Sequence, residues 1–195
     1  MNNIFNNIFC INLDFRKDRW QRCEEFFEEK NLNVERWDAV KGSDAALAST
    51  LSHYNLVKHA KEKNLDNIFI FEDDFYFIDY NLKKIEDAFK ELPQDWDVFY
   101  LGYNPTEKLI TYSENLYRIY GAWTTHAYAI NKKFYDVILN NFVVRMDIIL
   151  KNFQRTHNFY GINPIVCIQR NDWSDIDHQY NPNGDIILEA VKRFS

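Results

Sequence analysis

Three consecutive carboxylates, Glu72, Asp73 and Asp74, stand between the large apolar residues Phe71 and Phe75. This crowding is costly, because the negative charges repel one another and lose water beside apolar side chains. A magnesium or manganese ion would offset that cost, since these ions bind carboxylate oxygens together with the oxygens of a phosphorylated substrate. The triplet therefore predicts a divalent metal site that faces a diphosphate. The alternative interpretation is a solvated loop that ends a strand.

The segment before the triplet indicates how these carboxylates are positioned. Residues 68–71 are wholly apolar, which is typical of a buried parallel strand whose carboxyl end lies at the ligand-binding edge of an α/β sheet. Asp14 follows another apolar run and is a natural N-cap for the next helix. Hydrophobic periodicity predicts further strands at 8–13, 34–40, 97–101, 116–120, 126–130 and 165–169, and helices at 17–31, 44–64, 81–92, 132–141 and 147–153. We expect one α/β/α domain over residues 1–195, with a central mixed sheet.

The composition of the chain limits its possible binding partners and its expected cellular compartment. The formal net charge is −6 and no Lys/Arg stripe is present, which disfavours a nucleic-acid partner. Cys10, Cys23 and Cys167 are widely spaced in apolar segments, so we expect reduced core thiols. The sequence shows neither a secretion signal nor a membrane-spanning apolar run, and we expect a cytoplasmic protein. An amphipathic segment at 185–194 leaves peripheral membrane contact open, although core packing explains it better.

Short motifs elsewhere in the chain accompany the triplet. They are Ile11-Asn-Leu-Asp14 with Arg16, Asp18 and Arg19; Asp38-Ala-Val40 with Gly42; Ser52-His53; Tyr100-Leu-Gly102; His126-Ala-Tyr128; Asp147; and Gln169 with Ser174-Asp-Ile176. Their order and spacing resemble glycosyltransferase family 25, which groups bacterial lipooligosaccharide galactosyltransferases with collagen galactosyltransferases. The resemblance implies a GT-A type fold, a UDP-sugar donor carrying galactose or glucose, Mn²⁺ or Mg²⁺ as cofactor, and inversion at the anomeric carbon.

The same resemblance assigns residues to the nucleotide. It implies that Asn12, Asp14 and Arg16 lie near the uracil and ribose, and that Asp38 accepts hydrogen bonds from ribose hydroxyls. These types suit the task, because amides and carboxylates recognise a base edge or a ribose and Arg recognises phosphate. The alternatives are a helix cap for Asp14, a surface helix position for Arg16 and for Arg19, and a turn residue for Asp38.

The resemblance also implies the phosphate and metal residues. Glu72 and Asp74, completed by a C-terminal His178, are the expected metal ligands, and Asp73 and His53 are assigned to the donor. His53 would donate to a phosphate or support the metal-binding carboxylates. A lone helical histidine is otherwise a structural hydrogen-bonding residue.

Transfer with inversion requires a general base for the acceptor hydroxyl. The resemblance and the sequence around Asp147 make this residue the candidate, because it opens a helix whose positive dipole would keep it ionised. Simple N-capping is the alternative. Four further residues are expected in the acceptor or sugar pocket, with core packing or ordinary loop as their alternatives: Tyr103, Asn104, Trp123 and His126.

The sequence leaves several functions open. The main prediction is transfer of a hexose from a UDP-sugar to a hydroxyl of a glycan or protein acceptor. The principal alternative is a catalytically weak sugar-nucleotide-binding protein that serves as a partner or regulatory subunit. A metal-dependent phosphohydrolase would need a second cluster of carboxylates or histidines, which the sequence does not display. An interaction module built on the C-terminal helix is the third alternative.

Overall fold

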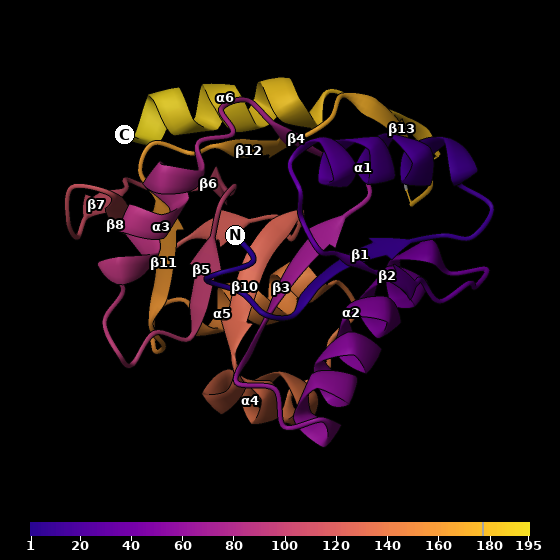
Figure 1. Cartoon of the computed structure of the whole chain (residues 1–195), viewed down its shortest axis with the longest axis horizontal. Coiled ribbons are helices and arrows are strands. Elements are labelled where there is room, and N and C mark those ends of the chain that lie inside the picture. Colours follow the sequence, from indigo (N-terminus) through magenta and orange to yellow (C-terminus); the bar gives the residue numbers. More distant parts are fainter. Residues whose placement is uncertain (177) are drawn as a thin grey trace.

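A computed structural model describes residues 1–176 and 178–195 of the chain. Its centre is an eight-stranded mixed sheet in the order β2-β1-β3-β10-β5-β11-β8-β7 (Figure 1). The strands are β1 (Ile8–Asn12), β2 (Glu35–Asp38), β3 (Asn67–Glu72), β5 (Val98–Tyr100), β7 (Ile110–Thr111), β8 (Leu116–Arg118), β10 (Ala127–Asn131) and β11 (Phe159–Ile162). β1 runs parallel to β2 and β3, whereas β10 is antiparallel to both β3 and β5. The predicted mixed sheet is confirmed.

The central strand β3 is buried on both faces, as its apolar sequence predicts. Ile68 and Ile70 point into one hydrophobic cluster, and Phe69 and Phe71 point into the other. Successive side chains of a strand lie on opposite faces of the sheet, so an uninterrupted apolar run is the pattern of a strand covered on both sides. The triplet thus begins where a rigid, fully buried strand ends.

Helices cover both faces of the sheet and make the α/β/α sandwich. They are α1 (Lys17–Glu29), α2 (Ala45–Glu62), α3 (Leu82–Lys90), a 3-10 turn η1 (Lys132–Phe134), α4 (Tyr135–Asn140), α5 (Met146–Phe153) and α6 (Asn183–Phe194). Buried side chains of α1 and α3 belong to one hydrophobic cluster, and those of α2, α4 and α5 belong to the other. α6 lies against β12 (Cys167–Gln169) and β6 (Asn104–Pro105).

The prediction that Asp14 caps the first helix is wrong, whereas another aspartate caps the second helix. Asp44 accepts a hydrogen bond from the Leu47 amide at 2.9 Å and caps α2. Asp14, in contrast, does not cap α1: the N-cap position is Arg16, and the Asp14 carboxylate binds Lys41 Nζ at 2.6 Å. Leu13 to Arg16 form a turn before the helix, so the carboxylate lies too far upstream to reach the first free amides.

Short ladders complete the fold outside the main sheet. β4 (Phe75–Phe77) pairs with β12, β6 pairs with β9 (Ala122–Trp123), and β13 (Asp172–Ser174) pairs with β14 (Gln179–Asn181). The three cysteines are free and buried, as predicted. Within the described residues, no helix combines the length and apolarity that crossing a bilayer requires.

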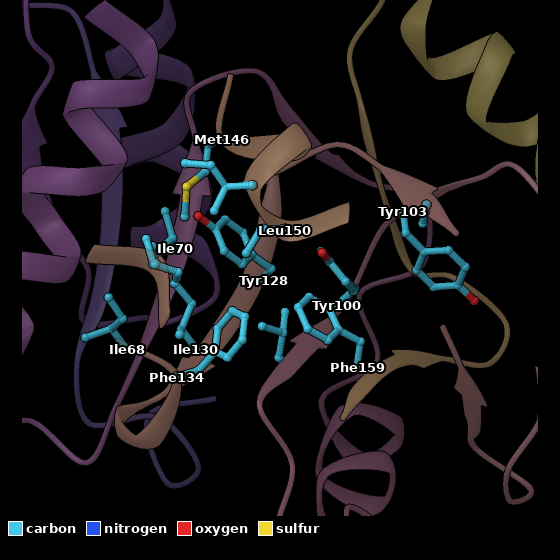
Figure 2. Close-up of a cluster of buried hydrophobic side chains, with 14 of the residues drawn as sticks. Ile68, Ile70, Tyr100, Tyr103, Tyr128, Ile130, Phe134, Met146, Leu150 and Phe159 are labelled. Carbon is cyan, nitrogen blue, oxygen red and sulfur yellow. The ribbon is translucent and has the colours of Figure 1, made fainter. Parts of the chain in front are cut away.

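One hydrophobic cluster fixes the position of α5 against the sheet. Figure 2 shows Met146 and Leu150 above Ile70 of β3 and Tyr128 of β10. Each of these four side chains is almost completely buried. Such packing locks the first turn of α5, and therefore the neighbouring Asp147, relative to the end of β3.

Candidate active site

A cavity of about 550 Å³ opens where β1, β2 and β3 end. The strand register explains its position, because Ile11 of β1 pairs with Glu72 of β3 and Asn12 pairs with Asp38 of β2. The carboxyl ends of three parallel strands therefore meet at one edge. The lining comes from this edge, the start of α2, the start of α5 and the segment around β13.

Asp74 has an unsatisfied carboxylate oxygen in this cavity. Its Oδ2 accepts a hydrogen bond from Gln169 Nε2 at 3.2 Å, but its buried Oδ1 has no hydrogen-bond partner among residues 1–176 and 178–195. Burial, followed by the negative charges of Glu72 and Asp73, raises the pKa of Asp74 to about 8. A buried acceptor without a partner is costly, and here it is a carboxylate beside two others. This group is therefore suited to bind a cation.

The Glu72 side chain is held in place by Thr125 and by His53, which Tyr128 supports in turn. Glu72 Oε1 accepts from Thr125 Oγ1 at 2.5 Å and lies 3.0 Å from Nε2 of His53, whose Nδ1 lies 2.9 Å from the Tyr128 hydroxyl. Burial raises the pKa of Glu72, but the hydrogen bonds from His53 and Thr125 outweigh it, and the net pKa lies below the usual value. His53 lines the cavity, yet both ring nitrogens are engaged, so it supports Glu72 directly.

Asp73 lines the same cavity as Glu72 and Asp74 and takes part in a buried ion pair. Its Oδ1 accepts from Arg19 Nη1 at 2.9 Å, and its Oδ2 accepts from Asn12 Nδ2 at 2.7 Å. Burial raises the pKa of Asp73 even though Arg19 and Asn12 act to lower it. Arg19 also donates to the Trp173 carbonyl at 2.6 Å and is 7% exposed, so the surface alternative considered for it is wrong. Asn12 is buried as well and acts on the triplet through Asp73.

Removal of this arginine tests the ion pair. We expect Arg19→Met to lower the free energy of unfolding by about 3 kcal/mol, because it leaves the Asp73 carboxylate buried and uncompensated. The matched control is Arg22→Met, which removes a more exposed partner of Asp172 and should change stability by less than about 0.5 kcal/mol. Urea unfolding measures both variants. Equal stabilities would contradict the structural role assigned to the Arg19–Asp73 pair.

The structure places four predicted nucleotide residues outside the cavity lining: the buried amide Asn12, and the three charged residues Asp14, Arg16 and Asp38. Asp14 binds Lys41, Asp38 binds Arg36 Nη1 at 2.8 Å in an exposed position, and Arg16 binds Asp18 and Asp175. Their charges are satisfied by protein partners. The lining at the same strand ends includes Lys41 together with small, apolar and aromatic residues: Leu13, Phe15, Ala39, Val40, Gly42 and Ser43.

Phe15 is the residue at this end that sequence reasoning missed. This residue is 60% exposed although it lies only three positions after β1 and lines the cavity. An aromatic residue within the charged stretch Asp14 to Arg19, just past a strand end, was the available signal.

None of the four residues predicted for the acceptor or sugar pocket lines the cavity. Tyr103 is fully buried against Gly161, donates its hydroxyl to the Ile162 carbonyl at 3.0 Å, and lies within the core cluster of Figure 2. Asn104 pairs with Trp123 across the β6–β9 ladder, and Lys151 Nζ covers the Trp123 ring at 3.5 Å from its centroid.

His126, the fourth of these residues, is buried behind the triplet. Its Nε2 lies 3.3 Å from the Cys167 carbonyl, and its backbone carbonyl accepts from the Glu72 amide at 3.0 Å. Burial lowers the pKa of His126 to about 4. A Cβ on Gly102 would approach His126 Nε2 to 2.2 Å and the Cys167 carbonyl to 2.0 Å, so close packing accounts for the glycine and the histidine of these two motifs.

Asp147 lines the cavity in the first turn of α5, as predicted. Its Oδ1 accepts from the Ile148 amide at 2.9 Å, and it is not the N-cap, which is Arg145. Burial raises the pKa of Asp147 and the charge of Glu72 adds to that increase, whereas the hydrogen bond from the Ile148 amide acts to lower it. A carboxylate with a raised pKa is a better proton acceptor near neutral pH.

Backbone strain marks the wall beside Asp147. Arg145 has φ 81° and Thr124 has φ 85°, and both line the cavity. The left-handed region is unfavourable for non-glycine residues and especially for a β-branched threonine. Such strain is concentrated at ligand sites, where the surrounding contacts maintain it. The Arg145 amide is held by Thr50 Oγ1 at 2.7 Å.

The predicted metal residues are brought to the same cavity but not into a preformed cage. Glu72, Asp74 and His178 all contribute to its lining. No group of three His, Cys, Asp or Glu side chains in residues 1–176 and 178–195 is arranged to hold a metal ion. The unpartnered Asp74 Oδ1 and the adjacent Glu72 nevertheless fit a hard cation that takes one or two protein carboxylates and completes its shell with phosphate and water. The role of His178 stays a prediction.

Comparison with known sequences defines the class of protein. The sequence model of Glycosyltransferase family 25 (LPS biosynthesis protein) matches residues 43–160. This stretch is more than half of the chain and contains His53, the triplet and Asp147. The chain belongs to glycosyltransferase family 25, and the expected α/β fold with a central mixed sheet is confirmed.

Individual relatives are more distant. Procollagen galactosyltransferase 1-A of Xenopus laevis is 28% identical over 129 residues, which cover 50% of this chain and 21% of that protein. Procollagen galactosyltransferase 2 of Homo sapiens is 26% identical over 129 residues with the same coverage. The chain thus matches about a fifth of the length of these curated relatives. Among solved structures, A197 from STIV aligns with a TM-score of 0.57 and 14% identity over 90% of this chain and 94% of that one, which shows a shared fold.

Proposed function

We propose that this protein is a glycosyltransferase that moves a hexose, galactose or glucose, from a UDP-sugar to a hydroxyl of a glycan or protein acceptor. The observation that carries the proposal is the unpartnered Asp74 carboxylate oxygen, which lies with Glu72 and Asp147 around one cavity at the ends of three parallel strands. Membership of family 25 supports the reaction class, and the names of the galactosyltransferase relatives support the hexose.

The residues divide the chemistry between them. A bound Mn²⁺ or Mg²⁺ would stabilise the charge of the departing diphosphate, with Asp74 and Glu72 as its protein ligands. His53 and Thr125 orient Glu72, while Arg19 and Asn12 fix Asp73 and with it the backbone of the triplet. The donor diphosphate would therefore lie over the end of β3.

Asp147 supplies the general base in this proposal. It accepts the proton of the acceptor hydroxyl while that oxygen bonds to the anomeric carbon, and the bond between that carbon and the diphosphate oxygen breaks to release UDP. Attack from the face opposite the leaving group inverts the anomeric configuration. The raised pKa of Asp147 and its place in the cavity lining support this role.

Phe15 is proposed to stack on the uracil ring. This exposed residue lines the cavity just after β1, whereas the carboxylates that would face the phosphates lie at the end of β3. We expect Phe15→Ala to weaken UDP binding about tenfold, since one ring stacked on a base contributes on the order of 1–3 kcal/mol. Phe142→Ala is the control, because Phe142 is also exposed but lies outside the cavity lining. Isothermal titration calorimetry with manganese present measures both; equal affinities would contradict the role of Phe15.

Manganese-dependent binding of UDP tests the proposal at its first step. We expect calorimetry to show UDP binding that is strong with manganese and weak after chelation, because the triplet repels a diphosphate unless a cation intervenes. Binding without any turnover of UDP-sugars would instead favour the sugar-nucleotide-binding alternative. Failure to bind UDP in either condition would contradict the proposed site.

A further inference from the structure

We propose that Trp173 and Tyr180 form a stacking surface for a pyranose ring of the acceptor, at the edge of the cavity. The inference rests on the proposed function, since it names where the acceptor binds. It assigns the acceptor site to the β13–β14 ribbon, which contains none of the four residues that the sequence indicated for that pocket.

The two rings share one face of the ribbon. Trp173 and Tyr180 are directly paired across β13 and β14, and directly opposed residues project to the same side of a sheet. Their exposed fractions are 50% and 62%, which is unusual for large aromatic side chains. Among the ring contacts of the described part of the chain, none involves Trp173 or Tyr180. The face of the ribbon is therefore open.

The ribbon is continuous with the active site. Trp173 lines the same cavity as Asp74 and Asp147. Arg19 donates to the Trp173 carbonyl at 2.6 Å and to Asp73 at 2.9 Å, so one guanidinium joins the ribbon to the acidic triplet. Arg22 adds an ion pair with Asp172 at 3.1 Å, and Figure 1 shows β13 beside α1. These contacts hold the aromatic face at a fixed position relative to the reaction centre.

The chemistry of this face fits a neutral sugar. A pyranose ring presents axial C–H groups that pack on an aromatic face, while its hydroxyl groups remain available to polar neighbours. The nearby carboxylates of Asp172 and Asp175 are paired with Arg22 and Arg16, so these two carboxylates would not repel a neutral sugar's hydroxyl groups or attract a cation. The donor phosphates have their own site at Glu72 and Asp74, and the acceptor must approach from outside the cavity.

Nuclear magnetic resonance of the indole N–H groups tests the assignment with methyl β-galactoside, lactose and UDP as probes. The chain has five tryptophans, and the peak of Trp173 is identified by its loss in Trp173→Phe. We expect at least one of the two sugars to shift the Trp173 peak, in the presence of manganese and UDP, and to leave the other four peaks in place. Trp173→Ala and Tyr180→Ala should each weaken the binding of that sugar about tenfold. Tyr112→Ala, an exposed aromatic outside the cavity lining, should leave it unchanged.

The outcomes separate this inference from the proposed function. A Trp173 peak that moves with UDP but with neither sugar would assign the surface to the nucleotide and overturn the inference. The absence of any shift with either sugar, in a protein that binds manganese and UDP, would overturn it as well and leave the donor site intact. Loss of UDP binding in the wild-type protein would instead contradict the proposed function.

Discussion

Asp74→Asn is expected to reduce the release of UDP from a UDP-sugar by at least about a thousandfold, because it removes a charged ligand of the metal that stabilises the leaving group. Asparagine has nearly the same shape and can keep the hydrogen bond with Gln169, so the fold should persist. Asp136→Asn, an exposed carboxylate on α4, is the control and should keep full activity. Retention of manganese-dependent turnover by Asp74→Asn would contradict the assignment of the metal site.

The same variant has a predicted effect on stability. The folded pKa of Asp74 is about 8, above the ordinary value of 3.8, so ionisation is penalised only in the folded state. Below both values the penalty is absent; it grows as the pH rises from about 4 and is complete above about 8. Metal-free Asp74→Asn should therefore be more stable than the wild type at pH 9 and similar to it at pH 4. Urea unfolding at the two pH values checks the sign.

Manganese binding should follow the same titration. The ion displaces the Asp74 proton, so its apparent affinity should fall by up to about tenfold per pH unit below pH 8. Calorimetry in two buffers of different ionisation enthalpy would detect the released proton. Manganese binding that releases no proton would show that a group other than Asp74 binds the metal.

Asp147→Asn is expected to lower kcat by about 10² to 10⁴, the usual contribution of a positioned general base. The amide cannot take the acceptor proton but preserves the volume at the start of α5, so UDP binding with manganese should stay within about twofold of the wild type. Asp136→Asn again serves as the matched control. The measurement is kcat for transfer, with UDP affinity determined separately by calorimetry.

The pH profile provides a second test of Asp147. Burial raises the pKa of this carboxyl, so kcat should fall as the pH drops through that raised value, when the base becomes protonated. A loss of affinity for UDP in Asp147→Asn, with kcat unchanged, would identify Asp147 as a donor-binding residue instead.

Elements with a strong local pattern could be predicted from the sequence. The apolar run of β3, and the periodic spacing of α1 and α2 with the Asp44 cap, require only neighbours in the chain to be recognised. β11 and the β6–β9 and β13–β14 ladders could not be predicted in this way. They are short, and their pairing depends on partners far along the sequence, where tertiary contacts outweigh local propensity.

The candidate site shows the same division. Four predicted residues line one cavity: Glu72, Asp74, His53 and Asp147. Their positions could be predicted because each lies at a strand end or on a helix that the sequence indicates. The buried position of the Tyr103 ring could not be predicted from the sequence. The direction of a side chain after a strand depends on which face the strand buries, and Gly161 leaves space for this ring inside the core.

The ion-pair partners of charged residues could not be predicted for a related reason. Asp38 and Arg16 have suitable types at suitable positions, but each has an ion-pair partner, Arg36 or Asp175, that only the folded chain brings near. The buried position of Arg19 could not be predicted, because its partner Asp73 lies 54 positions away. The side chain type indicates what a residue can bind, and the fold determines what is left to bind.

Release of UDP from a panel of UDP-sugars, with and without manganese and with a broad set of glycan and peptide acceptors, tests the central claim most directly. The account predicts release that is selective for one hexose donor, requires manganese, and is lost in both Asp74→Asn and Asp147→Asn. Manganese-independent release that persists in both variants, or the absence of release from every donor, would contradict it.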